Sequence, residues 1–188
     1  MDSPTAPRGI EPWITLSREK MLDCVIFSVH RVRRRSPDGE KDRDFYALES
    51  RDWVNIVAVT PDDRVVLVRQ YRQGTDEISL EVPGGIVDEG EDPEATALRE
   101  LEEETGYHGA RAEMLGRVRA NPAFLDNSLD IVAVLGAEPL GSTSFDDSED
   151  LELVLEPVEA IDRLITSGAI THSYSVLALL MYQRWRNG

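Results

Sequence analysis

A chain of 188 residues, 41% hydrophobic and 30% charged, is long enough for one domain with a substantial core. Its formal net charge of −16 argues against nucleic acid or an anionic membrane as partner, because both call for a basic surface. No apolar run reaches the roughly 20 residues of a membrane helix, and the N-terminus lacks a secretory signal pattern. Cys24 is the only cysteine, so no internal disulfide forms, and we expect a cytoplasmic protein.

The first 50 residues predict an arm followed by an antiparallel β-hairpin. Residues 1–20 begin with three prolines and little periodicity, which is typical of an extended arm. Residues 21–35 alternate loosely and are rich in Val, Ile and Phe, and 43–50 would return as the second strand after a Pro-Asp-Gly turn. The hairpin is therefore expected within residues 21–50.

Residues 51–188 predict a single α/β domain. Apolar runs at 53–60 and 64–71 indicate two buried strands, and 78–85 indicates a short strand that ends in Pro-Gly-Gly. Later strands are expected at 112–120, 129–137 and 151–156, with helices near 157–166 and 173–186.

An acidic segment follows the paired glycines. Residues 84–107 hold nine carboxylate side chains and a single arginine, Arg99. Asp92 followed by Pro93 predicts a helix start, with a capping side chain and then a proline at the first helical position. Gly106 predicts the end of the helix, because glycine readily adopts the left-handed conformation found there.

Three glutamates of this helix share one side. At 100° per residue, Glu100, Glu103 and Glu104 fall within an arc about 100° wide. Such carboxylates repel one another unless a cation neutralises them, and oxygen ligands favour Mg²⁺ or Mn²⁺ over zinc. A solvated acidic face is the alternative. Gly84 and Gly85 favour the metal site, because they let the backbone turn tightly and bring a carbonyl close to a metal.

The spacing of the acidic segment resembles the signature of the Nudix hydrolase family, in its ADP-ribose pyrophosphatase and nucleoside diphosphate sugar hydrolase branch. That signature reads Gly, five residues, Glu, seven residues, then Arg-Glu-apolar-x-Glu-Glu-x-Gly-apolar. This chain carries it as Gly85, Glu91, Arg99, Glu100, Leu101, Glu103, Glu104, Gly106 and Tyr107.

The resemblance implies an α/β/α sandwich with a mixed β-sheet and metal-dependent hydrolysis of a nucleoside diphosphate linked to another group. It implies that the Gly84 carbonyl, Glu100, Glu103 and Glu104 bind Mg²⁺, or alternatively Mn²⁺. Glu103, Glu104 and Arg99 would be catalytic, with Arg99 orienting the glutamates. Metals in such a site neutralise the pyrophosphate and acidify a bound water.

Two further segments resemble the same branch. By that resemblance, Arg72 and Glu81 would lie near the substrate, although a plain strand-end ion pair is the alternative. The branch also tends to carry a proline about 15 residues past the signature, which Pro122 matches. The sequence around it reads Asn-Pro-Ala-Phe and not Pro-Gly-Phe, which favours a nucleoside diphosphate sugar other than ADP-ribose.

The resemblance also implies a catalytic base in the acidic loop at 141–150. Glu149 is the first candidate and Glu152 the second, with a solvated acidic loop as the alternative. The three widely spaced histidines, His30, His108 and His172, are expected in surface or capping roles.

The sequence therefore predicts a Mg²⁺-dependent pyrophosphatase that converts a nucleoside diphosphate sugar to a nucleoside monophosphate and a sugar phosphate. ADP-ribose is the nearest alternative substrate, and a non-catalytic nucleotide-binding Nudix module is the rival from another class. The N-terminal hairpin resembles the element through which relatives form dimers, so a homodimer is expected.

Overall fold

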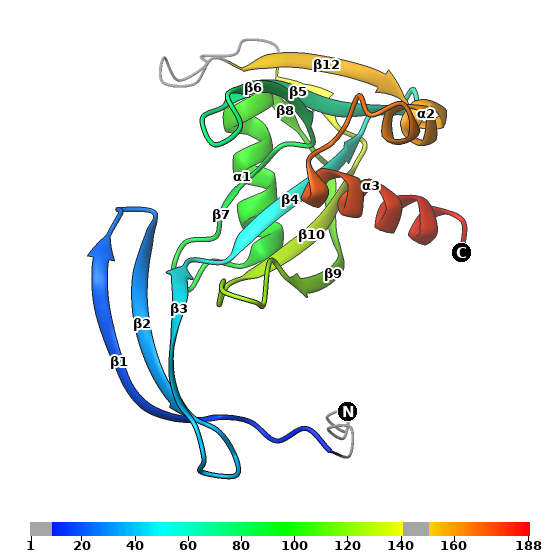
Figure 1. The fold of residues 1–188 in the computed structure, drawn as a ribbon. Coiled ribbons are helices and arrows are strands. Elements are labelled where there is room, and N and C mark those ends of the chain that lie inside the picture. Colours follow the sequence, from blue (N-terminus) through cyan, green and yellow to red (C-terminus); the bar gives the residue numbers. More distant parts are fainter. Residues whose placement is uncertain (1–8, 141–150) are drawn as a thin grey trace. The chain divides into compact units, whose positions relative to one another are not determined.

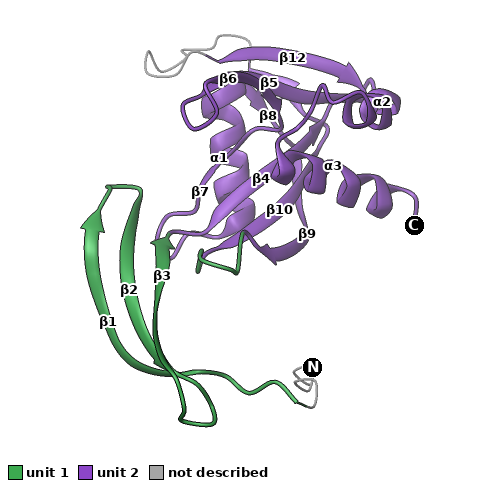
Figure 2. Cartoon of the chain, in the orientation of Figure 1, with its two compact units in different colours: residues 1–50, 121–126 green, residues 51–120, 127–188 purple. Residues whose placement is uncertain are grey.

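The computed structural model describes residues 9–140 and 151–188. The chain divides into two compact units (Figure 2): residues 1–50 with 121–126, and residues 51–120 with 127–188. Each unit has its own β-sheet.

The first unit is a three-stranded antiparallel sheet in the order β1-β2-β3 (Figure 1). Its strands are β1 (Ile14–Asp23), β2 (Phe27–Arg35) and β3 (Asp42–Ser50). The expected two-stranded hairpin was therefore incomplete, because β1 begins inside the segment predicted to be an arm. Pro12 is the last proline before β1, so every residue of the strand keeps the N–H group that ladder pairing requires.

The second unit contains a seven-stranded mixed sheet. The order of its main path is β12-β5-β4-β10-β9, with β6 paired to β5 and β7 paired to β4. Strand β10 runs parallel to β4, whereas its pairing with β9 is antiparallel. The strands are β4 (Trp53–Val59), β5 (Arg64–Arg72), β6 (Glu77–Glu81), β7 (Gly84–Ile86), β9 (Arg111–Arg119), β10 (Ser128–Leu135) and β12 (Glu152–Pro157). Two short strands, β8 (Tyr107–His108) and β11 (Glu138–Pro139), pair separately.

Helices cover both faces of this sheet, which gives the α/β/α sandwich (Figure 1). Alternate residues of β4 and β10 enter two separate cores, as the period of a strand requires. One core contains Ile56 of β4 and Leu101 of helix α1 (Pro93–Thr105). The other contains Val57 of β4 and side chains from α2 (Ile161–Thr166) and α3 (Ser173–Arg186), with the 3₁₀ turn Val158–Ala160 before them.

Helix α1 begins and ends at the predicted residues. The Asp92 carboxylate accepts hydrogen bonds from the backbone N–H groups of Glu94 at 2.9 Å and Ala95 at 3.2 Å. Gly106 adopts a φ of 67° at the C-terminal cap, a conformation that glycine reaches without steric cost. These two caps place the glutamates of the helix beside strand β7. Across the described parts of the chain, no helix is long and apolar enough to span a membrane.

Candidate metal and substrate site

Strand β7 brings the paired glycines against both β4 and α1. Gly84 is the register partner of Asn55, and a Cβ on Gly84 would collide with the backbone carbonyl oxygen of Val54. A Cβ on Gly85 would collide with the carboxylate of Glu100. Only a residue without a side chain allows this approach, so the two glycines fix how closely the backbone comes to the acidic helix.

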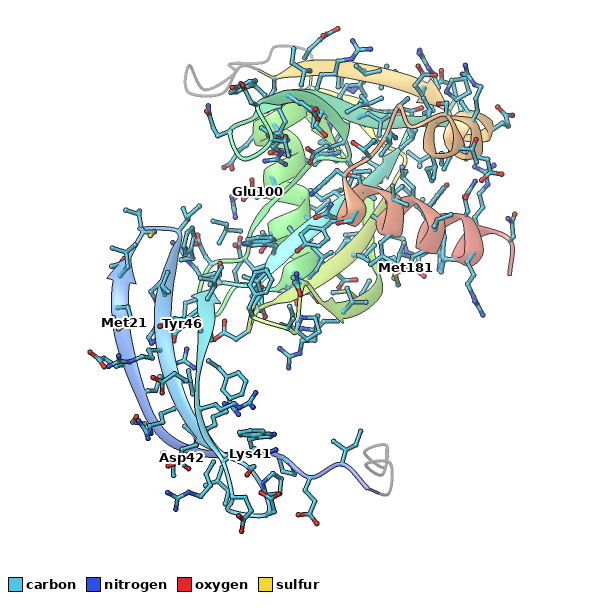
Figure 3. All side chains as sticks on the ribbon, in the orientation of Figure 1. Met21, Lys41, Asp42, Tyr46, Glu100 and Met181 are labelled. Atoms are coloured by element: carbon cyan, nitrogen blue, oxygen red, sulfur yellow. The ribbon has the colours of Figure 1, made fainter. Side chains whose placement is uncertain are left out.

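Two of the three glutamates converge on the glycines, and the third lies further out. Glu104 Oε2 accepts a hydrogen bond from the Gly84 backbone N–H at 2.9 Å. The Glu100 side chain is 15% exposed and lies against Gly85; Figure 3 labels it on α1. Glu103 is 59% exposed and stands at the outer edge of the group. The predicted set is thus gathered on one side of α1, with Glu100 and Glu104 innermost.

Arg99 binds three of the surrounding carboxylates at once. Its Nη1 donates to Glu100 Oε1 and to Glu103 Oε2, both at 2.9 Å. Its Nε and Nη2 donate to the two carboxylate oxygens of Glu91 at 3.2 and 3.1 Å. The Glu91 hydrogen bonds raise the pKa of Arg99, and in return they lower the pKa of Glu91 to about 2. Arg99 therefore stays charged and compensates the repulsion between these acids.

The donors in this group suit a hard divalent cation. They are carboxylate oxygens beside a backbone that carries no side chain, without a thiolate or imidazole among them. In the described part of the chain no three acidic, His or Cys side chains are already gathered as a complete ligand set. Arg99 holds two of the three glutamates in this arrangement, so a bound cation would compete with its hydrogen bonds.

Arg72 and Glu81 form a second charged pair on neighbouring strands. Arg72 Nε donates to Glu81 Oε1 at 2.8 Å, and Arg72 Nη2 donates to Oε2 at 2.7 Å. His172 Nδ1 lies 2.7 Å from Oε2, while the Glu81 side chain itself is only 1% exposed. Burial alone would raise the pKa of Glu81, but the hydrogen bonds from Arg72 and His172 outweigh it and lower the pKa to about 2. The carboxylate is ionised and held on two sides.

Because the pKa of Glu81 is lowered in the folded protein, we expect the free energy of unfolding to decrease in acid. A carboxyl group whose pKa is lowered on folding stabilises the protein above its unfolded pKa of 4.5, and that contribution disappears as the pH falls towards 2. The Glu81 contribution is on the order of 3 kcal/mol. We expect the free energy of unfolding of the metal-free wild type, measured with urea, to fall by this amount between about pH 5 and about pH 2.5. This is roughly the range between the unfolded and folded pKa values of Glu81.

The matching variant is Glu81→Gln, which should lack this part of the acid dependence. Glu77→Gln on the exposed end of the same strand serves as the control and should keep it. Equal acid dependence in the wild type and in Glu81→Gln would contradict the assignment.

His172 is a residue of this site that the sequence did not reveal. We expected a surface or capping role, but its side chain makes no capping hydrogen bond to α3 and contacts Glu81 instead. A histidine and a glutamate so far apart in the sequence form no local pattern. Only the packing of α3 against the sheet brings them together.

The remaining predicted residues lie elsewhere. Pro122 belongs to the first compact unit, with β1, β2 and β3. Glu149 lies outside the described residues. Glu152, the second candidate for the base, is 67% exposed and pairs with Arg69 across β12 and β5 at 2.8 Å. The roles assigned to all three stay predictions.

The second unit is an α/β/α sandwich that carries an acidic helix, and the carboxylate donors of this helix suit a hard divalent cation. The chain belongs to the NUDIX domain family, whose model matches residues 49–177. The family assignment agrees with the resemblance inferred from the acidic segment, and it makes the chain a Nudix hydrolase.

The chain is similar to individual proteins over more than two thirds of its length. The chain is 32% identical to a methanol dehydrogenase activator from Bacillus methanolicus, over 69% of this chain and 71% of that protein. It is 32% identical to an ADP-ribose pyrophosphatase from Bacillus subtilis, over 90% and 91%. Among solved structures, an ADP compounds hydrolase matches with a TM-score of 0.85 and 25% identity, covering 97% of this chain and 98% of that one.

Proposed function

We propose that this Nudix hydrolase cleaves the pyrophosphate bond of an ADP-linked compound, either ADP-ribose or an ADP-sugar, to give AMP and a sugar phosphate. The observation that carries the proposal is the convergence of Glu100 and Glu104 on the Gly84–Gly85 backbone. The names of the Bacillus subtilis relative and of the matching solved structure point to the ADP group. ADP-ribose therefore stands beside the other nucleotide sugars, although the residues around Pro122 depart from the Pro-Gly-Phe pattern.

The proposed metal is Mg²⁺, with Mn²⁺ as a substitute. Glu100, Glu103, Glu104 and the carbonyl of Gly84 would hold it. When bound, the cation offsets the negative charge of the pyrophosphate and lowers the pKa of a coordinated water. Arg99 orients Glu100 and Glu103 by its hydrogen bonds, which limits how far these side chains must move.

Arg72 is the proposed substrate contact. Its side chain is 46% exposed, whereas the carboxylate that anchors it is buried. Glu81 binds two of the guanidinium nitrogens and thereby fixes the plane of the guanidinium group. A guanidinium held in this way binds a phosphate oxygen with little loss of side-chain freedom. We assign the proton-abstracting role to Glu149 and a substrate contact to Pro122, both as proposals.

We further propose that the chain forms a homodimer through the first unit. Its sheet exposes Tyr46 at 61% and Met21 at 48%, which Figure 3 labels, and the turn between β1 and β2 exposes Val25 at 94%. Exposed apolar groups gathered on one small sheet mark an association surface. Sedimentation analysis should give the mass of a dimer, and a monomer at micromolar concentration would contradict the proposal. The reduced Cys24 fits a cytoplasmic location.

The substrate proposal is tested with a panel of compounds. The protein is incubated with Mg²⁺ and ADP-ribose, ADP-glucose, UDP-glucose, GDP-mannose or diadenosine polyphosphates, and the products are separated by chromatography. We expect the ADP-linked sugars to be cleaved fastest, with AMP as a product. Preference for a uridine or guanosine compound would contradict the adenine assignment. No cleavage with either metal would favour a non-catalytic nucleotide-binding module.

A further inference from the structure

The first turn of α3 lies against the strand that carries Glu81, and we propose that His172 positions the Arg72–Glu81 pair for substrate binding. The inference rests on the substrate contact proposed above for Arg72. The side chains of His172 and Arg72 contact the same atom, because Glu81 Oε2 lies 2.7 Å from His172 Nδ1 and 2.7 Å from Arg72 Nη2.

The direction of the His172 hydrogen bond follows from the state of Glu81. His172 Nδ1 lies 2.7 Å from Oε2, and an ionised carboxylate only accepts hydrogen bonds, so Nδ1–H is the donor in the hydrogen bond between the two residues. This donation fixes the rotation of the Glu81 carboxylate about its last torsion, which is otherwise soft. Because Arg72 is bound to both oxygens of that carboxylate, the plane of its guanidinium is fixed as well. His172 therefore acts on the substrate through Arg72 and does not need to touch it.

Two further side chains contact the imidazole, Tyr174 at the ring and Ser175 at the same Nδ1 atom. The Tyr174 ring meets it edge to face, with centroids 5.2 Å apart and an interplanar angle of 62°. Ser175 Oγ lies 3.0 Å from Nδ1 and also accepts a hydrogen bond from the Val82 backbone N–H at 3.2 Å. The first turn of α3 thus contacts two successive residues of the segment that leads to Gly84. Glu81, which anchors Arg72, and Val82, which follows it towards Gly84, are therefore both in contact with the start of α3.

Removing the imidazole tests the inference by steady-state kinetics on the preferred substrate. His172→Ala should lower kcat/KM about tenfold, chiefly through a higher KM, because a phosphate contact is loosened. His172→Leu, which fills the same volume without a donor, should show the same loss. His172→Asn places an amide N–H near the position of Nδ1 and should restore the rate to within about threefold of the wild type. Thr171→Ala, at the exposed neighbouring residue, should leave the kinetics unchanged.

A double-mutant cycle separates positioning from a general packing role. If His172 acts through Arg72, then His172→Ala changes kcat/KM by less than about twofold in an Arg72→Ala background. Losses that multiply would overturn the inference, since they would show two independent effects. Failure of His172→Asn to restore the rate would also overturn it. Circular dichroism and Mn²⁺ binding, followed by electron paramagnetic resonance, should match the wild type in every variant.

The double-mutant cycle also distinguishes failure of the His172 inference from failure of the substrate contact proposed for Arg72. A large loss in Arg72→Ala with no loss in either His172→Ala or His172→Leu would overturn the role of His172 and leave the substrate contact intact. No loss in Arg72→Ala would overturn the substrate contact and the inference together.

Discussion

Glu104→Gln is expected to lower kcat about a thousandfold or more while the protein stays folded. Glu104 Oε2 already faces the Gly84 backbone N–H at 2.9 Å, so a glutamine oxygen can accept the same hydrogen bond and keep the loop in place. The substitution removes the negative charge that a divalent cation requires. The measurement is the rate of metal-dependent turnover on the preferred substrate, together with the unfolding curve.

Glu102→Gln is the matched control. Glu102 lies on the same helix and is exposed. Its substitution by glutamine removes the same charge as Glu104→Gln but leaves the contact with the Gly84–Gly85 loop unchanged. Its kcat should stay within about twofold of the wild type. Equal losses in the two variants would show that general charge and not the local geometry matters. Retained turnover in Glu104→Gln would contradict the metal assignment.

Gly85→Ala is expected to lower kcat about a hundredfold, because displacing a catalytic group by about 1 Å has that effect. The added methyl group would occupy the space of the Glu100 carboxylate, so either the side chain or strand β7 must move. Glu100 is also bound by Arg99, so its displacement disturbs the neighbouring Glu103. The loss should appear in turnover and in Mn²⁺ affinity, with a small change in stability.

Gly74→Ala provides the control for a glycine substitution. Gly74 lies in the turn between β5 and β6, and a Cβ there would meet no atom within 4 Å. Its turnover and Mn²⁺ affinity should equal those of the wild type. If Gly85→Ala behaves in the same way, then the close approach of the loop to Glu100 has no part in metal binding.

The bounds and the acidic side of α1 were predictable because the residues that determine them lie within or next to the helix in the sequence. Asp92, Pro93 and Gly106 determine where α1 begins and ends, and the structure confirms these bounds. The helical period alone places the three glutamates within one arc about 100° wide, so their common side was predictable. The strands with continuous apolar runs were equally predictable, since β4 is buried along most of its length and β5 is buried from Val65 to Val68.

Other features depend on pairing between distant segments. Strand β1 is exposed throughout and carries charged residues, so its sequence has no apolar pattern that distinguishes a strand from an arm. The contact of His172 with Glu81 requires α3 to pack on the sheet, which no spacing in the sequence predicts. Arg99 was expected to orient the glutamates, but its two hydrogen bonds to Glu91 depend on how the loop before α1 folds back.

The central claim is that water cleaves the bond between the two phosphates of an ADP-linked substrate in a reaction that needs a divalent cation. The most direct test is to run the reaction in ¹⁸O-labelled water with Mg²⁺ and to examine the products by ³¹P NMR and mass spectrometry. We predict AMP and a sugar phosphate, with one ¹⁸O atom in one of the two, and no reaction with excess chelator. Formation of ADP and a free sugar, or equal rates with and without the cation, would contradict the account.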